Sequence, residues 1–95
     1  MADISETLKE RGSRYGSFIG DATVAQELKF TLRETAHDNE RLENGWGSLD
    51  YDMQEALEQI STKMGRIVHG DPWYEDSWRD IAGYATLVAD RLEKL

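Results

Sequence analysis

Apolar residues recur at every third or fourth position along three stretches of the chain, which is the spacing of one face of an α-helix. The clearest stretch follows Ser48, the predicted N-cap, and its apolar residues are Leu49, Met53, Ala56, Leu57, Ile60, Met64 and Ile67. A second runs from about Glu75 to Glu93, with Trp78, Ile81, Ala85, Val88 and Leu92. The third begins at Asp21, a good N-cap, and runs to about Asn44. Each stretch predicts an amphipathic helix.

The remaining segments predict a short helix, a loop and a sharp turn. Asp3 and Glu6 have the spacing of a capping box, which indicates a short helix over residues 3–11. Glycine-rich residues 12–20 are predicted to form an ordered loop, and the polar stretch 33–41 is either solvent-facing or incompletely ordered. The turn at Gly70 and Pro72 ends the third helix. We therefore expect one all-α domain, residues 1–95, in which a short N-terminal helix and three longer helices form a bundle.

Composition narrows the classes of function. The 95-residue chain has 11 Lys+Arg against 19 Asp+Glu, a net charge of −8, and no cysteine. The negative charge opposes direct binding to nucleic acid or to anionic lipid. The lack of cysteine excludes disulfides, thiolate zinc sites and cysteine nucleophiles. No apolar run approaches the length of a membrane span and the acidic N-terminus is unlike a signal peptide, so a cytoplasmic location is expected.

Two pairs of carboxylates are the main candidates for chemistry. Glu55 and Glu58 are three residues apart on the predicted third helix, and Asp76 and Asp80 are four apart at the start of the last one. If the two pairs faced each other, they could hold Mg²⁺, which prefers oxygen ligands and bridges substrate phosphates. Such spacings are also common by chance in an acidic chain, so a solvated acidic face is the alternative.

Two cations lie close to these carboxylates in the predicted hairpin of the last two helices. Lys63 and Arg66 either bind the phosphates of a nucleotide or pair with Asp76 and Asp80 across the hairpin. Asp80 lies beside the apolar stripe, where a carboxylate needs a cation or a metal. Gly83, in the interior of the last helix, suggests the close approach of another helix.

Aromatic side chains gather beside the proline turn. Trp73, Tyr74 and Trp78 flank Pro72, where they could stack on a nucleobase or, more commonly, pack under the turn. The two histidines lack the paired spacing of a zinc-binding helix. Ser13, Ser17 and Ser77 have no histidine close by in sequence, which gives no support to a serine nucleophile.

Several of these residues carry a resemblance to a known family. Lys63-Met64-Gly65-Arg66-Ile67, the turn at residues 70–72 and above all the run Asp-Ser-Trp-Arg-Asp-Ile-Ala-Gly-Tyr-Ala at residues 76–85 resemble small phage and prophage proteins often labelled MazG-like. Residues 6–16 are also similar to that family. MazG proteins are all-α nucleoside triphosphate pyrophosphohydrolases that work as dimers or tetramers and bind magnesium through an E-x-x-E pair and an E-x-x-D pair.

The resemblance implies a role for particular positions. Glu55 and Glu58 match the first acidic pair, and Asp80 matches the final aspartate of the second. Ser77 stands where the second pair has its glutamate, with Asp76 beside it. What is implied is a Mg²⁺-dependent pyrophosphohydrolase or nucleotide binder in the cytoplasm of a phage host, with Glu55 activating the attacking water.

Two hypotheses about function remain open at this stage. In the first, the chain is a phage-encoded MazG-like hydrolase or nucleotide binder in which Lys63 and Arg66 hold the nucleotide. In the second, it is a non-catalytic helical interaction protein that engages a host protein or sequesters nucleotides. Both expect a homodimer or homotetramer, because three amphipathic helices and three tryptophans leave apolar surface for a partner to cover.

Overall fold

The computed structural model describes residues 4–95 and contains four α-helices, one short and three longer. They are α1 (Ile4–Tyr15), α2 (Phe18–His37), α3 (Tyr51–His69) and α4 (Glu75–Glu93), with a 3₁₀ turn, η1 (Gly45–Ser48), before α3. Residues 4–95 include no strand. The predicted all-α class is therefore confirmed, and so are the bounds of the last helix. Asp3 of the predicted capping box lies outside the described residues.

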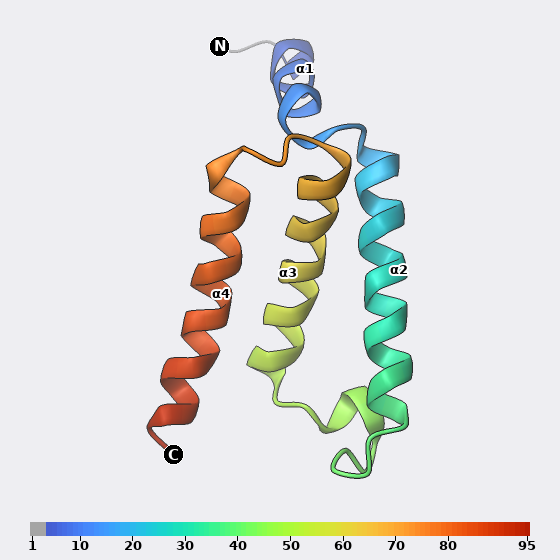
Figure 1. The fold of residues 1–95 in the computed structure, drawn as a ribbon, viewed down its shortest axis with the longest axis vertical. Helices are drawn as coiled ribbons and strands as arrows, with labels where there is room; N and C mark the ends of the chain where they lie inside the picture. Colours follow the sequence, from blue (N-terminus) through green and yellow to red (C-terminus); the bar gives the residue numbers. More distant parts are fainter. Residues whose placement is uncertain (1–3) are drawn as a thin grey trace.

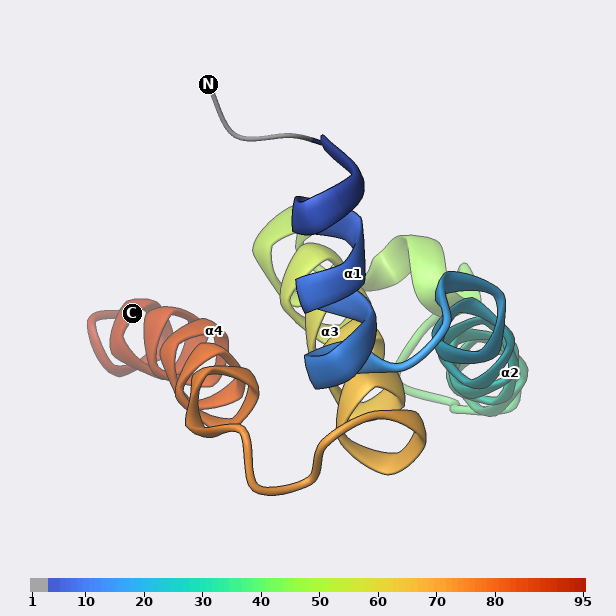
Figure 2. The ribbon, with the colours of Figure 1, turned by 90° about the horizontal axis from the view of Figure 1, so that it is seen from above.

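The three long helices lie side by side, with α3 between α2 and α4 (Figure 1). Seen from above, α2 and α4 flank α3 on opposite sides, and α1 lies across the end where α2 begins and α3 finishes (Figure 2). Because α3 packs against both neighbours, it is the central element of the fold.

The predicted loop over residues 12–20 is wrong. Helix α1 continues to Tyr15 and α2 begins at Phe18, so only Gly16 and Ser17 separate them. Gly16 has a φ of +79°, which lets the chain turn within these two residues. Ser17 is the N-cap of α2, and its hydroxyl accepts a hydrogen bond from the backbone N–H of Gly20 at 3.2 Å. One glycine in the left-handed region is enough to make the turn.

The predicted end of the second helix is also wrong, because α2 stops at His37 rather than near Asn44. The intervening polar residues form turns, in which the Asn39 side chain accepts a hydrogen bond from the backbone N–H of Arg41 at 3.0 Å. Asparagine competes with helical hydrogen bonding in this way. Gly45 follows with a φ of +58° and redirects the chain into η1.

The third helix begins two residues later than predicted. Its N-cap is Asp50 rather than Ser48, and Ser48 belongs to η1. The Ser48 hydroxyl instead accepts a hydrogen bond from the backbone N–H of Asn44 at 2.7 Å. The serine predicted to cap α3 therefore closes the loop that precedes it.

Glycines set how closely the first three helices meet. A Cβ atom on Gly65 would lie 2.8 Å from the carbonyl oxygen of Asp21, so α2 and α3 approach through bare backbone. A Cβ atom on Gly70 would lie 2.4 Å from the carbonyl carbon of Tyr15. Beside it, the N–H of Asp71 donates to the carbonyl oxygen of Arg14 at 2.8 Å. We call this meeting point of α1, α2 and α3 the glycine joint (Gly16, Gly20, Gly65 and Gly70).

Few apolar side chains are shielded from solvent by one chain alone. Within residues 4–95 the buried apolar residues are Ala25, Ala36, Ala56 and Ile67. Met64, Trp78 and Leu92, which the spacing assigns to the core, are 44%, 55% and 39% exposed. The apolar stripes of α3 and α4 therefore stay partly open to water.

The glycine joint predicts opposite effects for two Gly→Ala substitutions in helices. Gly65→Ala is expected to lower the free energy of unfolding by roughly 1–3 kcal/mol, because its methyl group would meet the backbone of α2. Gly83→Ala is the control, since nothing lies within 4 Å of its Cβ position. The free energy of unfolding of Gly83→Ala is expected to rise by about 0.5–1 kcal/mol, because alanine has a higher helix propensity than glycine. Urea unfolding followed by circular dichroism measures both free energies. Equal effects of the two substitutions would contradict a close approach of α2 and α3 at Gly65.

Candidate functional site

The carboxylates predicted to bind magnesium have separate partners within one chain. Glu58 faces α2 and accepts a hydrogen bond from the Arg33 guanidinium at 2.8 Å. Asp80 forms an ion pair with Lys63 at 3.0 Å. Each of these two carboxylates therefore already has a cation.

The other two carboxylates have no ion pair in the described part of the chain. Glu55 is exposed and accepts a hydrogen bond from the side-chain amide of Gln59 at 2.9 Å. Asp76 accepts a hydrogen bond from the Tyr74 hydroxyl, which raises the tyrosine pKa because the neutral phenol is the donor. Among the side chains that the structure describes, no three acidic or histidine residues come together as a metal site.

The two predicted phosphate-binding cations point to different places. Lys63 bridges α3 to α4 through Asp80, so the ion pair proposed across the hairpin is present for this pair. Arg66 lies over the ring of Tyr15, with 4.7 Å from its guanidinium carbon to the ring centroid. One cation therefore holds the hairpin, and the other faces the glycine joint.

The aromatic residues at the proline turn mostly take structural contacts. The indole N–H of Trp78 donates to the carbonyl oxygen of Pro72 at 2.8 Å. The ring of Tyr74 packs against that of Tyr15, with centroids 5.6 Å apart. Trp73 is 87% exposed. Two of the three aromatic residues thus fasten the turn rather than form a free stacking platform.

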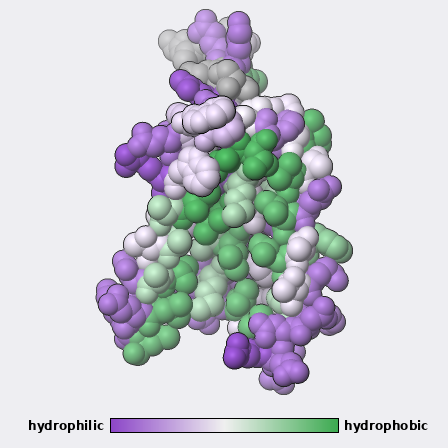
Figure 3. Space-filling model, in the orientation of Figure 1, coloured by the Kyte–Doolittle hydropathy of each residue, from purple (hydrophilic) through white to green (hydrophobic). Residues whose placement is uncertain are grey.

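An apolar groove runs between α3 and α4, with a volume of about 380 Å³. Every residue along it is apolar: Leu49, Met53, Ala56, Leu57 and Ile60 from α3 and the segment before it, and Ala85, Val88, Ala89 and Leu92 from α4. We call it the α3–α4 groove. The space-filling view shows hydrophobic side chains gathered over the middle of one face of the molecule (Figure 3). Such a patch is typical of a surface that another molecule covers.

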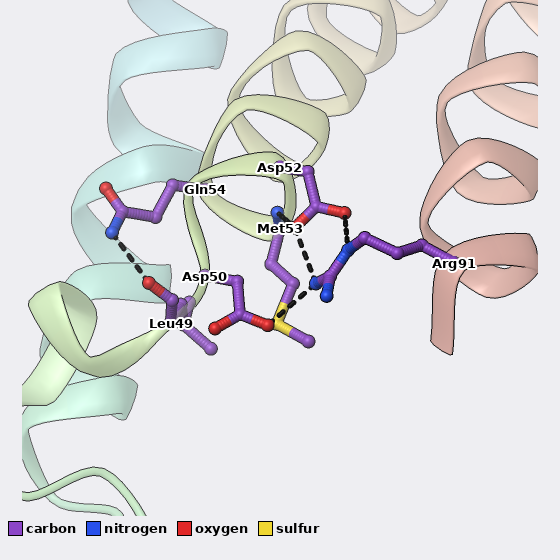
Figure 4. Close-up of polar contacts among 6 residues, drawn as sticks. All are labelled: Leu49, Asp50, Asp52, Met53, Gln54 and Arg91. Carbon is purple, nitrogen blue, oxygen red and sulfur yellow. Dashed lines mark hydrogen bonds and ion pairs between the residues drawn. The ribbon is translucent and has the colours of Figure 1, made fainter. Parts of the chain in front are cut away.

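A charged cluster joins α3 to the far end of α4. The Arg91 guanidinium reaches from α4 to Asp50 and Asp52 at the start of α3 (Figure 4). It donates to Asp50 at 2.7 Å and to the two oxygens of Asp52 at 2.5 and 2.7 Å. Hydrogen bonding to Arg91 lowers the pKa of Asp52, and the two carboxylates raise that of Arg91. With the Lys63–Asp80 pair, this cluster fixes α4 against α3 at two points.

A second cavity, of about 560 Å³, lies between α1, the start of α2 and α3. Ser17 and His69 meet beside it, with 3.2 Å between the serine Oγ and the histidine Nε2, although 52 residues separate them in sequence. Asp21 is 9% exposed, and its Oδ1 atom is buried without a hydrogen-bond partner. Burial raises the pKa of Asp21, and the nearby charges of His69 and Arg66 oppose that change.

The sequence patterns missed this cavity, because its residues come from three separate segments. The glycines at 16, 20, 65 and 70 were its one sequence signal, since each permits close approach of backbone. Glycine spacing does not say which segments approach each other. The prediction that Asp21 caps the second helix is wrong, because Ser17 is the N-cap and Asp21 lies in the first turn of α2.

Comparison with protein-family models, with curated proteins and with solved structures finds no match for this chain. None of the helices within residues 4–95 is long and apolar enough to cross a membrane.

The Arg91 cluster predicts how stability depends on pH. Because the pKa of Asp52 is lowered in the folded chain, the carboxylate contributes stability above its unfolded value near 3.8, and that stability is lost as the pH falls through the folded value. Arg91→Met should therefore make the melting temperature fall less steeply below about pH 5. Arg79→Met, which breaks an exposed pair with Glu75 within α4, is the control. Identical acid profiles for wild type and Arg91→Met would contradict this prediction.

Proposed function

We propose that this chain is a non-catalytic helical interaction protein, and that its α3–α4 groove docks against the same groove of a second copy. One observation supports the proposal most strongly. The groove has a wholly apolar lining and lies between two helices whose apolar stripes one chain leaves partly exposed. Covering such a surface releases water and favours association.

The shape of the groove suits a helix as its occupant. Ala85 and Ala89 are four residues apart on α4, and Ala56 faces them from α3. Small side chains at this spacing leave a depression that takes the ridge of another helix. A twofold pairing brings the same patch of each copy together, so each α4 can pack over the groove of the other.

The charges beside the groove permit a pairing of two acidic chains. Arg91 neutralises part of the charge of Asp50 and Asp52, and Lys63 does the same for Asp80. Like charges near the interface are thereby reduced, which matters for a chain with a net charge of −8. The divergence of the four predicted metal ligands favours this function over catalysis within one chain.

Self-association is tested with a charge placed in the groove. Val88→Glu is expected to convert a dimer or tetramer to monomer, because a carboxylate would be buried without a partner. Leu87→Glu is the matched control, since Leu87 is 69% exposed on the same helix and does not line the groove. Light scattering on the eluting protein, with circular dichroism to verify folding, reports both. A monomeric wild type at high micromolar concentration would refute the proposal.

A second candidate function is a Mg²⁺-dependent nucleoside triphosphate pyrophosphohydrolase whose site is completed between copies. The observation in its favour is that Glu55 and Asp76 have no cation partner in the part of the chain whose side chains are described. Carboxylates brought in by a second copy could complete a magnesium site, with Glu55 activating water and Lys63 as the cation nearer the phosphates. The resemblance to MazG proteins points the same way.

The two candidates are separated by assaying pyrophosphate release from a panel of nucleoside triphosphates with and without Mg²⁺. If the hydrolase function holds, Glu55→Gln should reduce turnover by roughly 10²-fold or more at unchanged folding, because it removes the general base. Glu34→Gln, an exposed glutamate on α2, is the control. Absence of Mg²⁺-dependent turnover in the wild-type oligomer would leave the interaction function alone.

A further inference from the structure

The cavity at the glycine joint combines an apolar wall with two cationic side chains. Ala22 and Ala25 of α2 form part of its wall. Leu8 and Phe18 also line it, and they are 63% and 86% exposed. A volume of about 560 Å³ lies within the range of small-molecule sites.

Lys29 and Arg66 line the same cavity, and neither has an ion pair with any side chain that the structure describes. Five other cations of the described chain are paired with carboxylates: Arg14, Arg33, Lys63, Arg79 and Arg91. In a chain with 19 acidic residues, two half-buried cations without an ion pair at one cavity are unexpected. Their charges are complementary to an anionic ligand.

Arg66 is held ready for such a ligand. Its guanidinium lies over the Tyr15 ring, 4.7 Å from the centroid, which limits its freedom. A cation resting on a ring face keeps its N–H donors in the guanidinium plane, where they can bind both oxygens of a carboxylate.

Asp21 limits the charge that the cavity accepts. Asp21 is 9% exposed in the wall, and its Oδ1 atom has no partner. A carboxylate there repels a dianion more than a monoanion, because the repulsion grows with ligand charge. This favours a carboxylate over a phosphate monoester.

We propose that the glycine-joint cavity binds a monoanionic amphiphile, a carboxylate with an apolar chain, with the carboxylate on Arg66 and Lys29 and the chain along Leu8, Phe18, Ala22 and Ala25. The site is at a different place from the α3–α4 groove and does not depend on self-association. It also does not depend on nucleotide hydrolysis.

The probe is decanoate, followed by titration calorimetry and by backbone amide shifts in NMR spectra. The largest shifts are expected at Ala22, Ala25 and Thr62, which line the cavity. Arg66→Met and Lys29→Met should each weaken binding by roughly tenfold, because a charge-assisted contact is lost. Arg41→Met, which removes another cation that has no ion pair in the described chain, should leave binding unchanged.

Two comparisons decide the charge preference. Asp21→Asn should tighten decanoate binding, because the repulsion is removed while the shape is kept. Decanol and decyl phosphate should both bind more weakly than decanoate to the wild type. If Arg66→Met disturbs folding because the contact with Tyr15 is lost, Lys29→Met still measures how much a cation in the cavity contributes to binding.

Three results would overturn the proposal. The first is equal binding of decanol, which would mean that only the apolar wall matters. The second is amide shifts concentrated at Val88 and Ala89, which would place the ligand in the α3–α4 groove instead. The third is absence of binding at millimolar decanoate.

Discussion

The close approach of backbone at the glycine joint is the constraint on which the rest of the structure depends. Gly65 lets α3 lie against the first turn of α2, and Gly70 lets the chain pass directly over the end of α1. Side chains at these positions would separate the three helices. The position of α3 then determines where α4 lies, because a short turn fastened by Trp78 and Pro72 joins them.

This arrangement gives the two faces of α3 different roles. On the side that faces α2, backbone and small residues such as Ala25 are in close contact, and this interface between the two helices is buried. Towards α4, two charged contacts, through Lys63 and Arg91, hold the helices while the apolar residues between them stay open. A surface of that kind is costly for an isolated chain and useful for an associating one. The proposed self-association follows from this asymmetry.

Sequence patterns predicted the helical class, because apolar residues at every third or fourth position in α3 and α4 lie on one face of a helix. They failed at the ends of helices, where a single residue determines whether the helix continues. A single positive φ at Gly16 replaced a predicted loop with a sharp turn. The second helix stopped at His37, and Asn39 just beyond it forms a turn. Among candidate site residues, the Lys63–Asp80 pair was one of two open alternatives. The meeting of Ser17 with His69 depends on tertiary packing, which sequence spacing does not encode.

The central claim is that the α3–α4 groove is an interface between two copies of the chain. Isotope-filtered NMR on a mixture of labelled and unlabelled protein tests it most directly, because only contacts between copies give signals. The account predicts intermolecular contacts from the methyl groups of Leu57, Val88 and Leu92, which line the groove. Intermolecular contacts confined to other surfaces, or none from a monomer at high micromolar concentration, would contradict it.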